Sequence, residues 1–395
     1  MQKTVLLVDP IHSFTYLSKS LKQYGVRSVA VFSDMSLISA FNRPGNHLFD
    51  RQIHLHSTDV NDIVASINEP IDFVLNGSDQ HLALAEQLME ILTPSLANDI
   101  NTINMRVSKY HQQQAMQEAG LPATAQWLFD QAHPDYASLQ RLTYPVFAKP
   151  VNGGGSIGIF KAESADELEK KLKAAPKTVN FEPITHYLIQ EYIDAKEVII
   201  DVFSAAGQHY ISQVYTYTKT FYRGAPIYRT LQPIEDQDQL EAIVTFCKKS
   251  LDACGYRTGF SHIELFQLDT QDFRLIELNP RISGLSGFAN IMANTRGIKS
   301  QVDLLVAYLT GQTLQDSDFN RCKKYAIIAC LYTHKPINFD DYQSEYEKIQ
   351  ISHTPLSSNI TPDLTDLRQV VMLSNKDRHC LNAEINALLK QDVIA

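Results

Sequence analysis

The sequence IELNPR at residues 276–281, with IEL at residues 263–265, decides the fold of this chain. Apolar residues alternate or cluster over residues 260–268 and 273–278, as they do in strands, and residues 267–271 between them predict a turn. Side chains two residues apart on a strand share a face. The two strands therefore predict a hairpin whose acidic side chains can lie on one side.

Glu264, Glu277 and Asn279 are candidate metal ligands in this hairpin. Mg²⁺ takes a few carboxylate or carbonyl oxygens from a protein and completes its coordination with water and substrate phosphates. Arg281 adds a forked donor that suits a phosphate or a carboxylate. The alternative is that both glutamates are ordinary solvated carboxylates. His262 shares the face of Glu264, and we predict that it is a neutral partner that orients a carboxylate or packs beside the site, rather than a base.

A second candidate site lies upstream, where a short apolar strand at residues 144–150 carries Lys149 and leads into a glycine-rich loop at residues 151–159. Three consecutive glycines permit positive φ, so several N–H groups can point at one anion, and the lysine adds a charge for the same phosphates. The loop is neither a Walker loop nor a GxGxxG turn that opens a helix. A flexible hairpin turn also explains the glycines, but the lysine on the preceding strand favours a ligand.

A third segment, residues 187–202, predicts a strand, a bend and a second strand. An edge of this kind can offer backbone donors and acceptors to a purine ring, and Glu197 is placed to accept from ribose hydroxyls. Taken singly, Glu191 and Glu197 would be interpreted as surface charges.

The order of these segments resembles the ATP-grasp superfamily. Lys109 comes first, then Lys149 with the glycine loop, then QEYI at residues 190–193 with Glu197, and then the hairpin carboxylates with Asn279 and Arg281. The resemblance covers roughly residues 105–300. Within the superfamily, SHIE at residues 261–264 and ELNPRISG at residues 277–284 are most similar to the carboxylate–amine ligases that make dipeptides from unprotected L-amino acids.

The resemblance implies a set of contacts with ATP and metal. The phosphates of ATP would contact Lys109, Lys149 and the loop formed by Gly154, Gly155 and Ser156. The adenine would contact Glu191, Tyr192 and Ile193, and the ribose would contact Glu197. Two Mg²⁺ ions are implied, for which Mn²⁺ can substitute, one on Glu264 and Glu277 and the other on Glu277 and Asn279. Arg281 would hold the transferred phosphoryl group and, with backbone N–H groups near Gly284, would stabilise the tetrahedral oxyanion.

The first-substrate contacts depart from the family pattern, since Ser108 and Asp79 stand where many relatives carry Asp and Glu. Asp79 follows a predicted strand at residues 71–75, where open α/β sheets place ligands, although a helix N-cap explains it equally well. An acidic group there would suit a basic first substrate such as arginine. Leu285 and Arg223 are further candidate substrate contacts, and the segment around Arg223, residues 210–231, is interpreted equally well as a solvated hairpin.

The pattern predicts an α/β (α+β) protein in three parts. Residues 1–104 form an N-terminal Rossmann-like α/β domain, residues 105–310 an ATP-grasp core with a glycine-rich lid at about 125–190, and residues 311–395 a C-terminal capping subdomain. A strand at 4–8, a helix at 14–24 and a strand at 28–32 predict a βαβ unit. The turn after its first strand has no glycine, which disfavours NAD or FAD there.

Composition excludes some classes of protein. A net charge of −9 disfavours nonspecific nucleic-acid binding, and five scattered cysteines without a CxxC pair disfavour a zinc site or a disulfide framework. No signal core and no stretch of ~20 apolar residues is present, so we expect a cytoplasmic protein. Its expected partners are small molecules, namely ATP and amino acid substrates, and not nucleic acid or membrane; a homodimer is left open.

The expected reaction is an ATP-dependent ligation. The carboxylate of one L-amino acid attacks the γ-phosphate, and the amine of a second attacks the aminoacyl phosphate, giving a dipeptide, ADP and phosphate. One alternative is an ATP-grasp ligase or carboxylase with another carboxylate or amine, such as a D-alanine-type ligase. A nucleotide-binding regulator without catalysis is the other.

Overall fold

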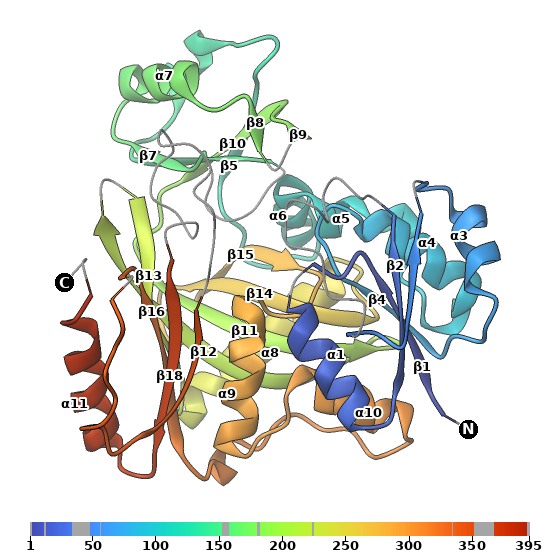
Figure 1. The fold of residues 1–395 in the computed structure, drawn as a ribbon. Helices are drawn as coiled ribbons and strands as arrows, with labels where there is room; N and C mark the ends of the chain where they lie inside the picture. The colour runs from blue at the N-terminus through green and yellow to red at the C-terminus, as the bar shows by residue number, and fades with distance from the viewer. Residues whose placement is uncertain are drawn as a thin grey trace.

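The computed structural model describes residues 2–11, 13–33, 48–55, 57–151, 158–179, 182–222, 225–333, 335–350 and 367–392. In these residues the chain forms a parallel sheet near the N-terminus, a small antiparallel sheet and a large antiparallel sheet, with helices packed around them (Figure 1). Gly154, Gly155, Ser156 and Arg223 lie outside the described residues. No helix in the described ranges is both long and apolar enough to cross a membrane.

The N-terminal sheet is four-stranded and parallel, in the order β3-β2-β1-β4. Its strands are β1 (Thr4–Val8), β2 (Arg27–Phe32), β3 (Arg51–His54) and β4 (Phe73–Asn76). The helices around it are α1 (Phe14–Gln23), α3 (Val60–Ile67) and α4 (Leu82–Leu92). Every residue of β1 is buried, as expected for a parallel strand covered on both faces. The predicted βαβ unit is thus confirmed.

Two short helices lead from this sheet into the rest of the chain. They are α5 (Asn104–Val107) and α6 (Lys109–Glu118), and they are separate because Ser108 between them is extended, with φ −108° and ψ 119°. Single 3₁₀ turns precede them at Pro94–Leu96 and Ile100–Thr102. Helix α6 is attached to β15 by Gln112, which donates to the Leu278 carbonyl and accepts from the Leu278 amide, both at 3.0 Å.

The small antiparallel sheet has the order β5-β10-β6-β7. Its strands are β5 (Gln126–Asp130), β6 (Val146–Pro150), β7 (Phe160–Ala162) and β10 (His186–Glu191), and α7 (Ala165–Ala174) and a 3₁₀ turn at Tyr136–Arg141 accompany it. Leu168 and Leu172 of α7 pack with Ala148 and Tyr187 in its core. A separate two-stranded ladder joins β8 (Thr178–Val179) to β9 (Glu182–Pro183). Figure 1 shows the four-stranded antiparallel sheet set apart from the large sheet.

The large sheet has eight strands in the order β15-β14-β11-β12-β13-β16-β18-β17, all antiparallel to their neighbours. They are β11 (Lys196–Ala205), β12 (Gln208–Tyr222), β13 (Ala225–Pro233), β14 (Gly259–Gln267), β15 (Phe273–Asn279), β16 (Tyr325–Leu331), β17 (Glu345–Gln350) and β18 (Gln369–Asn375). The last three, from the segment expected to be a capping subdomain, continue the core sheet through the pairing of β13 with β16.

Alternation along the strands separates the two faces of this sheet. Val198 and Ile263 pack on α8 (Gln237–Ala253), whereas Ile199 packs on α9 (Phe288–Arg296). Glu264 follows Ile263, so it lies on the face that carries α9. The remaining helices are α10 (Gln301–Leu309), which packs on β11, and α11 (Arg378–Leu389), which packs on β16 and β18, with short 3₁₀ turns at Leu285–Gly287 and Phe319–Arg321.

Candidate active site

The β14–β15 hairpin places its two glutamates directly opposite each other. Glu264 is the ladder partner of Glu277, but Leu265 is paired with Leu275, so Ile276 is an extra residue in a bulge. In a regular hairpin Glu264 would oppose Ile276, and Glu277 would face the other side of the sheet. The bulge is what brings both carboxylates to one face. Asn279 also lies there, and its side-chain nitrogen donates to Glu277 Oε1 at 3.0 Å. The predicted shared face is confirmed.

Two lysines from different elements approach these carboxylates. Lys109, the first residue of α6, has its Nζ 2.9 Å from Glu277 Oε2. Lys149 on β6 is 6% exposed and forms no ion pair with the described residues. Burial lowers the pKa of Lys149 to about 8, and the charge of Lys109 acts in the same direction, whereas Glu277 and Glu264 oppose it. The pair of lysines predicted to meet phosphates therefore converges on the carboxylates.

The carboxylate and amide groups fit Mg²⁺. Burial would raise the pKa of Glu277, but Lys109, Lys149 and Asn279 lower it to about 2, so the carboxylate is ionised. Like charges directly opposite each other destabilise an antiparallel pair, and a divalent cation between Glu264 and Glu277 would remove that repulsion. Among the described residues no group of three or more His, Cys, Asp or Glu could hold a metal. Water and phosphates would therefore complete the coordination, as Mg²⁺ prefers.

Glu197 lies on the same face of the sheet and is held by Lys219, from the segment at residues 210–231 that was expected either to reach the site or to be a solvated hairpin. Both of its carboxylate oxygens are 2.6 Å from Lys219 Nζ. Burial raises the pKa of Glu197, Lys219 lowers it, and the charge of Glu264 raises it. Lys219 Nζ also lies 4.8 Å from the centre of the Tyr228 ring. Lys219 follows Tyr217 by two residues on β12, so the two side chains share a face.

The residues expected near adenine link the small sheet to the large one. Glu191 ends β10, is exposed, and its Oε1 accepts from the Ala125 amide at 2.8 Å. The Tyr192 ring lies under Lys161 Nζ, 3.9 Å from the ring centre. Ile193 follows in the connection from β10 to β11. Their place between the two sheets is established, and their contacts with adenine remain a prediction.

Arg281 lies near the boundary with the N-terminal sheet, where it pairs with Asp79. Arg281 Nε donates to both carboxylate oxygens of Asp79, at 3.0 and 2.9 Å. Asn76, at the end of β4, donates to the Pro280 carbonyl at 3.1 Å. The N-cap of α4 is His81, so the helix-cap interpretation of Asp79 is wrong. The two residues assigned to phosphoryl transfer and to the first substrate thus form an ion pair.

The loop after Arg281 has an unusual backbone. Leu285 and Ser286 have φ values of 51° and 54°, which non-glycine residues rarely adopt and which often mark functional sites. Gly287 follows at 85°, and a Cβ there would lie 2.5 Å from Tyr16. Gly284 instead has open space around it. Leu285 packs with Tyr217 against the cluster around Phe288, so its predicted contact with a substrate side chain stays a prediction.

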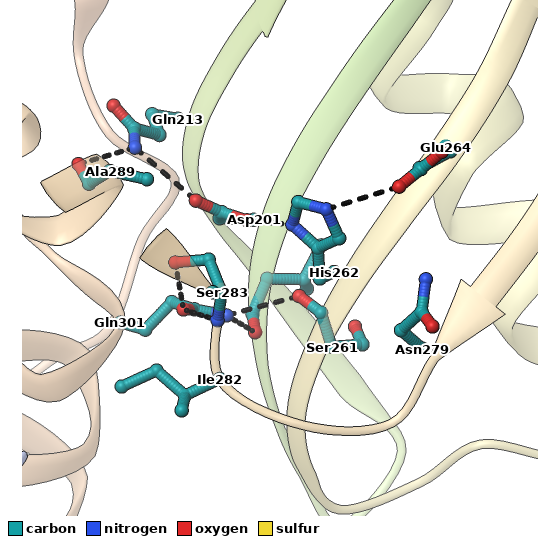
Figure 2. Close-up of polar contacts among 12 residues, drawn as sticks. Asp201, Gln213, Ser261, His262, Glu264, Asn279, Ile282, Ser283, Ala289 and Gln301 are labelled. Atoms are coloured by element: carbon teal, nitrogen blue, oxygen red, sulfur yellow. Dashed lines mark hydrogen bonds and ion pairs between the residues drawn. The ribbon is translucent and has the colours of Figure 1, made fainter. Parts of the chain in front are cut away.

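His262 lies between two carboxylates (Figure 2). Its Nδ1 is 2.9 Å from Asp201 Oδ1 and its Nε2 is 3.4 Å from Glu264 Oε1. Burial would lower its pKa, but hydrogen bonds to Asp201 and Glu264 raise it to about 9. The expected contact with a carboxylate is confirmed, whereas the two neighbouring carboxylates favour the charged ring over the neutral ring that was expected.

Arg229, in the hairpin that was expected either to reach the site or to be solvated, does neither. It is buried, and its Nη1 is 2.5 Å from Asp392 Oδ2, beyond the end of α11. Burial raises the pKa of its neighbour Tyr228, and the charge of Glu264 raises it further. The ladder pairs Thr218 with Thr230 and Lys219 with Tyr228, so Arg229 is an extra residue in a bulge of β13.

Comparison with known proteins identifies the domain that holds this site. Residues 142–288 match the family described as the ATP-grasp domain. The solved structure of an L-amino acid ligase from Bacillus licheniformis has a similar fold, with a TM-score of 0.74 and 18% identity, covering 99% of this chain and 98% of that one. Dapdiamide A synthase of Enterobacter agglomerans is 22% identical over 60% of this chain and 56% of its own length.

A second curated relative points to the same fold. D-alanine–D-alanine ligase of Francisella philomiragia subsp. philomiragia is 29% identical over 35% of this chain and 45% of its own length. This chain thus spans about half the length of these two curated relatives. The matched domain runs from just before β6 to the start of α9, and so contains Lys149, both facing glutamates, Asn279 and Arg281. The chain has the ATP-grasp fold, and its residues 142–288 match the ATP-grasp domain family, which the order of its motifs resembles.

Proposed function

We propose that this protein is an ADP-forming ligase that joins two unprotected L-amino acids through an aminoacyl phosphate. The observation that carries the proposal is the facing pair Glu264 and Glu277, with Asn279 beside them and Lys109 in contact. Such a set of hard oxygen donors and cations suits the triphosphate of ATP with Mg²⁺. The likeness to an L-amino acid ligase over nearly the whole chain supports the proposal at the level of the fold.

Phosphorylation explains why the site gathers so much positive charge. A carboxylate is a poor electrophile, and transfer of the γ-phosphoryl group gives it a leaving group. Mg²⁺, when bound, would offset charge on the phosphates; we propose two ions, one held by Glu264 and Glu277 and one by Glu277 and Asn279. Lys109 would exchange its contact with Glu277 for phosphate oxygens, and Lys149, whose pKa is raised by the charges of Glu277 and Glu264, would add a second cation.

Amide formation follows at the same place. The amine of the second amino acid attacks the acyl carbon, and phosphate leaves. Arg281, held by Asp79, would stabilise the developing oxyanion together with amides near Gly284. Adenine would lie by Glu191, Tyr192 and Ile193, and ribose by Glu197, for which Lys219 sets the carboxylate position.

The identity of the first amino acid is the finer part of this proposal. The prediction of a basic residue such as arginine rested on a carboxylate at Asp79. That carboxylate is paired with Arg281, which offsets its charge, so the geometry gives arginine no particular support. A D-alanine-type ligase is the second candidate, because the D-alanine–D-alanine ligase match lies in the curated set.

The test is release of phosphate from ATP and Mg²⁺ with the twenty L-amino acids and D-alanine, singly and in pairs, with mass detection of products. Release that depends on L-amino acids and yields a dipeptide mass would support the proposal. A product only with D-alanine would favour the second candidate. If no amino acid, alone or in a pair, causes phosphate release, both candidate functions are wrong. The Glu277→Gln protein, prepared in parallel, measures ATP hydrolysis by contaminants.

A further inference from the structure

Glu264 has one polar contact among the described residues, and that contact is His262. Glu277, by contrast, is held by both Lys109 and Asn279. The Glu264 side chain is 14% exposed, so its free oxygen faces the site. Its orientation therefore depends on what fixes His262.

His262 is fixed from its other side. Asp201 is fully buried, and its Oδ1 lies 2.9 Å from His262 Nδ1. Asp201 Oδ2 accepts from Gln213 Nε2 at 3.2 Å, and the same nitrogen donates to the Ala289 carbonyl at 2.5 Å (Figure 2). Ala289 lies in the first turn of α9. The chain of contacts thus runs from Glu264 to the helix that follows the Arg281 loop.

Both ring nitrogens of His262 have oxygen neighbours. Asp201 Oδ1, at 2.9 Å, and the Tyr215 hydroxyl, at 3.5 Å, lie beside Nδ1. Glu264 Oε1 and the Tyr217 hydroxyl, each at 3.4 Å, lie beside Nε2. With Asp201 holding Nδ1, the plane of the ring is fixed, and Nε2 is directed toward Oε1 of Glu264 and the Tyr217 hydroxyl. The other oxygen is left for a ligand.

We propose that His262 is a positioning residue, which with Asp201 orients Glu264 so that one carboxylate oxygen is reserved for the divalent cation. The proposal rests on the proposed function in one respect, that Glu264 is a metal ligand. Partners behind a ligand commonly matter for affinity, and their loss costs about 10–100-fold in metal binding. His262 itself makes no contact with the reacting atoms in this assignment.

Two substitutions separate positioning from simple packing. The amide nitrogen of Asn reproduces Nδ1 of histidine, and that of Gln reproduces Nε2. His262→Asn can keep the bond to Asp201 but not the bond to Glu264, whereas His262→Gln can keep the bond to Glu264. We expect Mn²⁺ affinity of the ADP complex, measured by electron paramagnetic resonance, to fall about 10–100-fold in His262→Asn and less in His262→Gln.

The chain offers a matched control in His209. It is also buried, its Nδ1 is 2.8 Å from Ser204 Oγ, and its Nε2 is 3.2 Å from Asp252 Oδ1. Neither partner belongs to the candidate site. His209→Asn and His209→Gln should leave Mn²⁺ affinity unchanged, and in the His262 variants the KM for Mg²⁺ should rise more than kcat falls.

Each outcome decides something. Equal Mn²⁺ affinity in wild type and His262→Asn, or equal losses in the Asn and Gln variants, would overturn positioning while leaving the ligase intact. If the wild-type protein with ADP binds no Mn²⁺, the assignment of Glu264 as a metal ligand is wrong, and so is the positioning role of His262. Should His262→Asn not fold, Asp201→Asn decides, because it removes the charge behind the ring, and we expect at least a several-fold loss of Mn²⁺ affinity.

Discussion

At the scale of single residues, Lys149 is a buried cation whose charge depends on what lies beside it. Burial lowers its pKa to about 8, below its ordinary value. Between those two values the unfolded chain binds more protons than the native one, so in the ligand-free protein this group makes stability rise with pH. A bound phosphate would favour the charged form. We expect ADP binding above about pH 8 to take up a proton, and its affinity to fall as pH rises further.

Calorimetry in buffers of different ionisation enthalpy measures that proton uptake directly. The matched variant is Lys149→Arg, since a guanidinium stays charged throughout this range and should bind ADP without the uptake. If the arginine variant takes up the same number of protons as wild type, the titrating group is elsewhere.

Glu277 is the residue on which both proposed metal positions depend. Glu277→Gln keeps one acceptor oxygen, for Asn279 or Lys109, but removes the charge, so we expect an intact fold and a loss of about 100-fold or more in phosphate release, the scale of a metal-ion contribution. The matched control is Glu345→Gln. Glu345 Oε2 lies 2.6 Å from Lys324 Nζ, and the Glu345 side chain is 74% exposed. Near-normal ADP formation in Glu277→Gln would contradict the metal assignment.

At the scale of elements, the turn between Arg281 and α9 contains two glycines with opposite surroundings. Gly287→Ala puts a Cβ 2.5 Å from Tyr16 at a φ of 85°, and we expect it to destabilise the protein by about 2 kcal/mol. Gly284→Ala meets no atom within 4 Å. It should leave the melting temperature unchanged and lower kcat/KM if substrate occupies that space.

Thermal unfolding and kinetics of both variants distinguish the two roles. A Gly284→Ala protein that melts early would show that this glycine is needed by the backbone, and full activity in that variant would place the substrate elsewhere.

At the scale of the whole molecule, the C-terminal segment is bound into the core by a buried ion pair. Arg229 on β13 contacts Asp392, whose other oxygen accepts from the Tyr332 amide at 2.9 Å. Breaking a buried pair leaves an uncompensated charge, so Asp392→Ala should lower the free energy of unfolding by about 3–5 kcal/mol. Asp318→Ala breaks the exposed pair with Arg321 and should cost less than about 1 kcal/mol. Equal denaturant midpoints for the two variants would refute this.

Local pattern was enough to predict much of this protein. The strand–turn–strand around Glu264, the strand that carries Lys149 and the βαβ unit follow from periodicity, which reports only which face a side chain shares with its near neighbours. The order of the motifs then indicated the superfamily. His262 and Glu264 lie on one face in the structure because they are two residues apart on β14.

Contacts between distant segments were decided by the tertiary structure alone. The bulge at Ile276 turns Glu277 toward Glu264, which strict alternation would have prevented. Lys109 reaches the site because Gln112 attaches α6 to β15, and Arg281 pairs with a residue of the N-terminal part. The hydrogen bond from Asp201 raises the pKa of His262, and Arg229 turns toward the C-terminal segment. Each depends on burial and on charges brought together across the fold, and a periodic pattern within one strand carries no information about either.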